Sequence, residues 1–135
     1  MNNPRTTTPE EVVAQIRQKS AEDAAVADRI LEWWGRFFAP KCNPESIRLE
    51  FRRAPIGFHP INITSDGKLY LQMPNIRDMM RSKEDFPEFK SGLDEIGFEK
   101  NPDFPWIRLG SLANDGGLSK FLKLMEWLIE RLRKF

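Results

Sequence analysis

The sequence has very little of the chemistry on which most enzymes depend. Its 135 residues include one cysteine, Cys42, and one histidine, His59. A single cysteine forms no disulfide within the chain, and these two residues offer too few soft ligands for a zinc site. The sequence also lacks a glycine-rich phosphate loop, a serine nucleophile between glycines, paired cysteines and a His–Glu metal motif. We therefore expect no metal, no cofactor and no enzymatic activity.

Long hydrophobic runs and an excess of either charge are also missing. No apolar stretch approaches the roughly 18 residues of a membrane span, and the N-terminus lacks the apolar core of a signal peptide. The 21 Lys and Arg residues nearly balance the 20 Asp and Glu residues, which leaves a net charge of +1. Net charge therefore gives no argument for binding nucleic acid or an anionic membrane. With its single cysteine, the chain is expected to be cytoplasmic and not to bind membranes.

The composition that remains is that of a folded domain. Apolar residues make up 40 % of the chain and charged residues 30 %, which is close to ordinary globular usage. A chain of this length buries about two-thirds of its unfolded surface without disulfides or metals. We predict a flexible N-terminal tail over residues 1–7 and a single domain over residues 8–135.

Helical signals occupy both ends of this domain. Thr8, followed by proline and two glutamates, predicts the start of a first helix. A second capping pattern, Ser20 followed by Asp23, predicts a break and a restart, and the second helix runs through Phe38 until Pro40 stops it. Three later helices are predicted from apolar spacing, over Asn75–Arg81, over Pro87–Ile96 with Gly97 as its stop, and from Leu118 to the C-terminal region.

Between the helical ends, the hydrophobic period changes to two. Apolar and charged residues alternate over Ile47–Arg53, which predicts a strand with one solvated face. Residues 54–60 contain two prolines and a glycine, so we expect a loop or a bulged edge there rather than a regular central strand. The short apolar run Trp106–Leu109 predicts a short strand or an extended segment.

A β-hairpin is predicted after residue 60. Its first strand, Ile61–Thr64, is followed by a three-residue loop in which Gly67 adopts the left-handed conformation. This loop pairs Ile63 with Leu69 and Ile61 with Leu71, and so places four apolar residues on one face. The side chains predicted for the opposite face are Asn62, Tyr70 and Gln72. The order of all these elements indicates an α+β fold. Its sheet is a small antiparallel three-stranded meander, with or without one short extra strand, and the N-terminal and C-terminal helices pack on one face of this sheet.

Six short patterns occur in a fixed order between Ala27 and Arg131. They are Ile30–Trp33, Asp66–Tyr70, Leu93–Gly97, Leu109–Asn114, Leu118–Leu122 and Glu126–Ile129. In these patterns the chain resembles a family of small uncharacterised bacterial domains. The resemblance implies a bacterial, cytoplasmic α+β module, and it implies no activity and no site residues.

Arginines on the first strand form one candidate site. Arg48 and Arg52 share its outward face, with Glu50 between them, and Arg53 lies at its end. Arginine binds phosphate through planar, bidentate contacts, so this face could bind nucleic acid. The alternative is a solvated face on which Glu50 neutralises its neighbours. Given this glutamate and the net charge, we expect nucleic-acid binding to be weak.

Trp33 is a second candidate. Adjacent tryptophans cannot share one stripe of a helix, so if Trp34 lies inside, Trp33 lies toward the boundary. Aromatic residues there often anchor a partner protein or a second copy of the chain. The alternative is that Trp33 packs beneath the first helix.

Two further residues have chemistry of their own. His59 has an unperturbed pKa suited to proton transfer near neutral pH, or it is simply a loop histidine bonded to backbone or water. Cys42 is either a thiol whose pKa is lowered by Lys41 or a small, semi-buried side chain.

These observations predict a non-enzymatic interaction or accessory module that binds a protein partner or a second copy of itself. The first alternative is a nucleic-acid-associated module that uses the arginine-bearing sheet face. The second is a small-molecule binder or enzyme with a pocket near His59.

Overall fold

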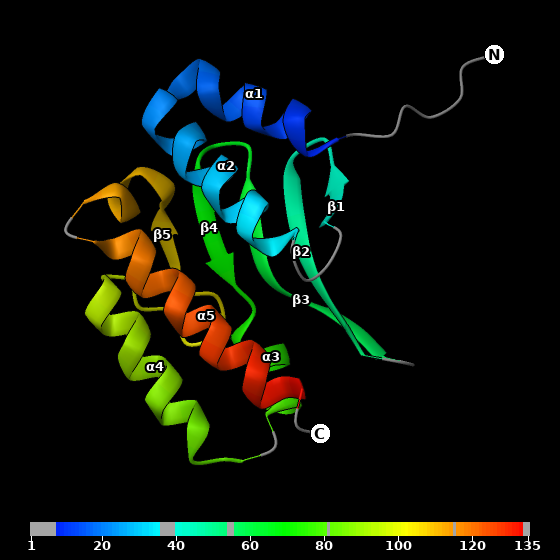
Figure 1. Ribbon diagram of the computed structural model, residues 1–135, viewed down its shortest axis with the longest axis vertical. Helices are drawn as coiled ribbons and strands as arrows, with labels where there is room; N and C mark the ends of the chain where they lie inside the picture. The colour runs from blue at the N-terminus through cyan, green and yellow to red at the C-terminus, as the bar shows by residue number, and fades with distance from the viewer. Residues whose placement is uncertain (1–7, 36–39, 54–55, 81, 115, 134–135) are drawn as a thin grey trace.

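The computed structural model describes residues 8–35, 40–53, 56–80, 82–114 and 116–133, and for 40–41, 50–53, 56–59 and 132–133 it describes the backbone alone. The fold is α+β, as predicted, with an open antiparallel sheet in which the five strands are ordered as in the sequence (Figure 1). The elements are α1 (Pro9–Lys19), α2 (Ala21–Trp34), β1 (Pro40–Asn43), β2 (Ser46–Arg53), β3 (Ile56–Thr64), β4 (Lys68–Leu71), α3 (Met73–Met79), α4 (Asp85–Ile96), β5 (Trp106–Arg108), the 3-10 helix η1 (Leu109–Ala113) and α5 (Gly117–Arg133).

Both predicted N-terminal caps are confirmed. Thr8 Oγ1 accepts a hydrogen bond from the Glu11 N–H at 3.3 Å, and Ser20 Oγ accepts one from the Asp23 N–H at 3.1 Å. Each bond satisfies one of the N–H groups that a helix leaves unpaired in its first turn. The predicted tail at 1–7 and the predicted continuation of the second helix through Phe38 lie outside the described residues.

The predicted three-stranded meander is too small, because β1 and β5 extend the sheet on its two sides. β1 pairs with β2, and Asn43 Oδ1 shapes the turn between them by accepting hydrogen bonds from the N–H groups of Glu45 and Ser46, both at 2.9 Å. Four residues beginning with a proline give no alternating pattern, so the sequence offers little sign of β1. The short strand expected at Trp106 is confirmed as β5, whereas η1 was not predicted.

A loop or a bulged edge was expected over residues 54–60. The described residues 56–60 belong to the central strand β3, so the loop and the edge position are wrong, whereas the expected bulge is present. The pairing of β2 with β3 shifts register between Leu49 and Phe51, where Leu49 faces Ile61 and Phe51 faces Phe58. Such a bulge leaves residues without a ladder partner, which is how a central strand can contain Pro60 despite its missing N–H. The Pro60 carbonyl still joins β3 to the residue after β4, because it accepts a hydrogen bond from the Gln72 N–H at 3.0 Å.

The predicted β3–β4 hairpin is confirmed in loop and register. Ile63 pairs with Leu69, Asn62 with Tyr70 and Ile61 with Leu71, and Gly67 has a φ of 88°. The later helices are close to their predicted positions, and Gly97, with a φ of 107°, ends α4.

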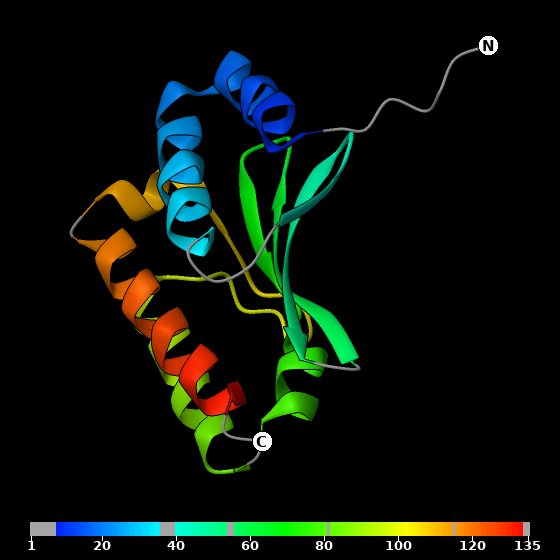
Figure 2. The same cartoon turned by 45° about the vertical axis from the view of Figure 1, so that its right-hand side comes forward.

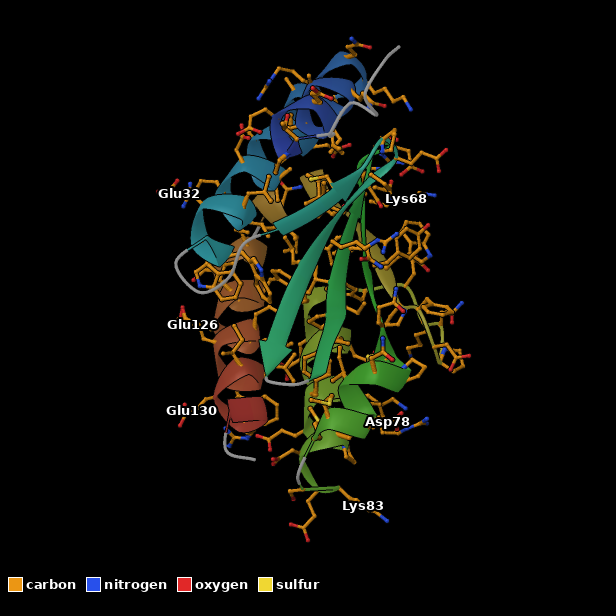
Figure 3. The ribbon with its side chains drawn as sticks, turned by 90° about the vertical axis from the view of Figure 1, so that its right-hand side faces the viewer. Glu32, Lys68, Asp78, Lys83, Glu126 and Glu130 are labelled. Atoms are coloured by element: carbon orange, nitrogen blue, oxygen red, sulfur yellow. The ribbon has the colours of Figure 1, made fainter. Side chains whose placement is uncertain are left out.

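The sheet has one covered side and one uncovered side. Its covered side contributes fully buried apolar residues to the core, among them Ile47, Ile61, Ile63, Leu69 and Leu71. Figure 2 shows α1, α2 and α5 stacked along this side. In Figure 3, α2 and α5 lie to the left of the strands and α1 lies at the top, while Lys68 points to the right. The single core cluster extends from Val12 in α1 to Ile129 in α5. The helices α1, α2 and α5 therefore cover one face of the sheet and leave its other face uncovered.

Candidate functional site

The uncovered side of the sheet carries a continuous row of large and polar side chains. Arg48 faces Asn62, Asn62 faces Tyr70, and Tyr70 faces Trp106, so one residue comes from each strand from β2 to β5. We define the open face as this row together with its neighbours on the same side, Ser46, Thr64, Lys68 and Gln72. Directly paired residues on one side of a sheet lie about 5 Å apart at Cβ, so the row forms a single surface.

A shallow hollow of about 490 Å³ lies on the open face. Its aromatic lining consists of Tyr70, Trp106 and Phe104, and the last of these is 44 % exposed. The rest of its lining is polar and uncharged, with the amides of Asn62, Gln72 and Asn101 and the hydroxyls of Ser46 and Thr64. Such a lining offers flat apolar rings beside hydrogen-bond donors and acceptors.

The rim of the hollow is fixed by a local turn. Asn101 Oδ1 accepts hydrogen bonds from the N–H groups of Asp103 and Phe104, both at 3.0 Å. This turn leads into β5, where the Glu99 N–H donates to the Trp106 carbonyl at 2.7 Å. The backbone thus holds Phe104 at the edge of the hollow.

The aromatic rings of the row lie close to one another. The centroids of Tyr70 and Trp106 are 6.4 Å apart, with ring planes tilted by 38°. Lys68 Nζ lies 4.7 Å from the Trp106 ring centroid and 3.9 Å from Asp66 Oδ2. The first distance is within the range of a cation–π contact, which orients the indole.

Asn62 has an unusual environment at the centre of the row. Its Oδ1 is buried, and the described residues provide it with no hydrogen-bond partner. A buried amide oxygen without a partner costs about 1–3 kcal/mol. Because the oxygen is buried, a donor from a bound molecule reaches it only when the Asn62 side chain turns toward the hollow that it lines.

Only one arginine of the predicted face has a side chain among the described ones. Arg48 is exposed on the open face, as predicted. Arg52 and Arg53 belong to β2 beyond the register shift, and their side chains lie outside the described ones, as does that of His59 in β3. The predicted roles of these three residues stay predictions.

The expected exposure of Trp33 is wrong. Trp33 is only 5 % exposed, packs against Trp34 at 5.7 Å between ring centroids, and donates from Nε1 to Glu126 Oε1 at 3.2 Å. Its contact with α5 explains the error, because Glu126 lies 93 positions away in the sequence. The two residues border a groove of about 510 Å³ between α2 and α5, which also includes Glu32. In Figure 3, Glu32 and Glu126 lie on the side of the molecule opposite Lys68.

Of the two alternatives for Cys42, the structure supports the small, semi-buried side chain. Burial raises its pKa, and the carboxylates of Glu10 and Glu11 on α1 raise it further. The alternative of a lowered pKa is wrong, because these carboxylates and the loss of solvent both oppose a thiolate.

Asp23 has a structural role beyond the capping pattern predicted from the sequence. Its side chain is 4 % exposed, and its carboxylate accepts hydrogen bonds from the Gly110 N–H at 2.7 Å and from Arg108 Nη1 at 3.2 Å. Arg108 also donates to the Asp66 carbonyl at 3.3 Å. A Cβ at either Gly67 or Gly110 would collide with this carboxylate. Asp23 therefore ties α2 directly to η1 and, through Arg108, to β5 and to the turn of the β3–β4 hairpin.

The described residues form neither a metal site nor a membrane-spanning helix. Within them, no three His, Cys, Asp or Glu side chains gather where they could hold a metal ion. No helix formed by the same residues is both long and apolar enough to cross a membrane. Comparison of the chain with protein-family models, with curated proteins and with solved structures finds no match.

Proposed function

We propose that the protein is a non-enzymatic binding module whose partner docks on the open face. The observation that carries this proposal is the uncovered sheet side with three grouped aromatic residues, Tyr70, Phe104 and Trp106. Tyrosine, tryptophan and phenylalanine are enriched at binding interfaces, where they bury a large area and lose little conformational entropy.

The chemistry of the hollow supports binding rather than catalysis. Its lining contains amides, hydroxyls and rings, and none of its lining residues is a carboxylate, an imidazole, an amine or a thiol. The hydroxyls of Ser46, Thr64 and Tyr70 act in catalysis when an adjacent base activates them, and the lining supplies no such base. Amides and rings orient a bound molecule without transferring protons.

The cellular setting belongs to the same proposal. One semi-buried cysteine with a raised thiol pKa suits a reducing cytoplasm. The ordered patterns between Ala27 and Arg131 support membership of the bacterial family that the chain resembles.

Site-specific photocrosslinking in the native cells tests the proposal. Replacing Phe104 with p-benzoylphenylalanine keeps an aromatic ring at the rim of the hollow and adds a reactive ketone. The matched control carries the same residue at Ser119, which is exposed in the groove between α2 and α5. We expect defined adducts from position 104 and none from position 119. Adducts from position 119 alone, or none from either position, would contradict the proposal.

A further inference from the structure

We propose that the open face binds single-stranded nucleic acid, with unpaired bases stacked on Tyr70 and Trp106. This inference rests on the proposed function and names the chemical class of its partner.

The first support is the arrangement of the rings. Tyr70 and Trp106 are direct neighbours on adjacent strands, with centroids 6.4 Å apart, and Phe104 adds a third ring at the rim of the same hollow. Aromatic rings on the outer side of a sheet provide stacking platforms for the bases of a single strand. In a duplex the flat faces of the bases are already stacked, so this surface favours unpaired bases.

The second support is the group of amides around the rings. Asn62, Gln72 and Asn101 line the same hollow. An amide presents one acceptor and one donor group, and this pair matches the edges of nucleobases. Asn62 Oδ1 is buried and has no partner among the described residues, so a turn of this side chain toward the exocyclic amino group of a base would satisfy it.

The third support is the position of charge relative to the hollow. Its lining is uncharged, while Arg48 lies directly beside Asn62, and Lys68 lies over Trp106. Arg48 can bind a backbone phosphate directly, and Lys68 can bind a second one after it leaves the Trp106 ring and Asp66, while the bases occupy the neutral centre. Asp66 and Glu99, at the hairpin turn and beside Trp106, limit the total positive charge.

A protein partner fits this lining less well. The three rings suit a protein partner as well, but the rest of the lining is amide and hydroxyl with no aliphatic residue, whereas the core of a protein–protein interface is mostly apolar. Stacking with few phosphate contacts predicts modest affinity, in the range of about 10⁻⁶–10⁻⁴ M at physiological salt. It also predicts a shallow salt dependence, with a slope of about −1.4 for two contacts to a single strand.

Fluorescence anisotropy with labelled octamers tests the inference. The probes are mixed-sequence single-stranded RNA, single-stranded DNA and the corresponding DNA duplex. We expect at least one single strand to bind at least about tenfold more tightly than the duplex. Trp106→Phe, which keeps an aromatic ring, should retain the affinity within about threefold, whereas Trp106→Leu, which keeps only apolar bulk, should weaken it at least about tenfold.

Charge variants complete the test. Arg48→Ala should flatten the salt slope by about 0.7, and Lys123→Ala, on the exposed side of α5, should leave it unchanged. No binding by either single strand up to about 1 mM at low salt, equal affinity for the duplex, or an unaffected Trp106→Leu variant would overturn the inference. If the oligonucleotides fail while position 104 crosslinks to a protein, the partner class is wrong and the proposed function stands. If both fail, the proposed function fails as well.

Discussion

Replacement of Asp23 by alanine should destabilise the protein strongly, although Asp23 is far from the hollow. The carboxylate bonds the buried Gly110 N–H at 2.7 Å, and a hydrogen bond to a buried charged group is worth about 1.5–3 kcal/mol. The pair with Arg108 adds only about 0.5 kcal/mol, because the arginine side chain is 52 % exposed and solvent screens it. The expected loss in the free energy of unfolding is therefore about 2–4 kcal/mol, or about 10 °C in Tm.

Urea unfolding followed by circular dichroism measures this loss. The matched control is Asp28→Ala on the same helix, since Asp28 pairs with Arg17 at 3.0 Å while both side chains are more than half exposed. The control should change the free energy of unfolding by no more than about 0.5 kcal/mol. Asp23→Asn, which keeps an acceptor for Gly110, should lie between the two. An Asp23→Ala loss no larger than that of the control would refute the role of Asp23 as a tie between α2 and η1.

Two further predictions concern the backbone and the thiol. Gly67→Ala should lower the free energy of unfolding by about 3 kcal/mol, because strain at positive φ adds to a collision with Asp23. Gly97→Ala should lower it by only about 1 kcal/mol, because an added Cβ there meets nothing within 4 Å. Equal losses of stability in thermal melts would show that no collision occurs at Gly67. Cys42 should react with iodoacetamide at pH 8 more slowly in the folded than in the unfolded chain, and Glu10→Gln should accelerate the folded reaction by lowering the thiol pKa. The Cys42 thiol holds its proton more tightly in the folded chain than in the unfolded chain, so the protonated thiol favours folding. This contribution to the free energy of unfolding is complete below about pH 8.5, the ordinary pKa of a cysteine, and is lost as the pH rises through the pKa of the folded state. A folded chain that reacts as fast as the unfolded one would contradict this prediction.

Features that depend on nearby residues could be predicted from the sequence. The caps at Thr8 and Ser20 and the loop at Gly67 involve partners only a few positions away. In the hairpin, only one register places all apolar residues on one face, so side-chain alternation decides the pairing.

Features that depend on distant partners could not be predicted in this way. The Asp23 carboxylate binds Gly110, 87 positions away, although local spacing suggests a role at the cap of its own helix. Trp33 likewise bonds a distant residue, Glu126 on α5, 93 positions away. Pro60 argued against a central strand, and only the bulge between β2 and β3, which follows from the whole sheet, resolves the conflict.

The open face was predictable in part. Alternation along the strands correctly placed Arg48, Asn62, Tyr70 and Gln72 on the outward side. The contribution of Trp106 was not foreseen, because β5 joins β4 from a position more than 30 residues later in the chain. The aromatic pair that carries the proposed function exists only once that pairing forms.

A two-dimensional ¹⁵N–¹H NMR titration with a single-stranded octamer tests most directly whether the open face is the binding surface. We predict that the Trp106 indole resonance and the backbone amides of Asn62 and Tyr70 shift together as the oligonucleotide is added. The Trp33 indole, whose N–H is bonded to Glu126 at 3.2 Å in the groove between α2 and α5, should stay unchanged. Shifts centred on Trp33 with the open-face resonances unmoved would contradict the assignment of the binding surface.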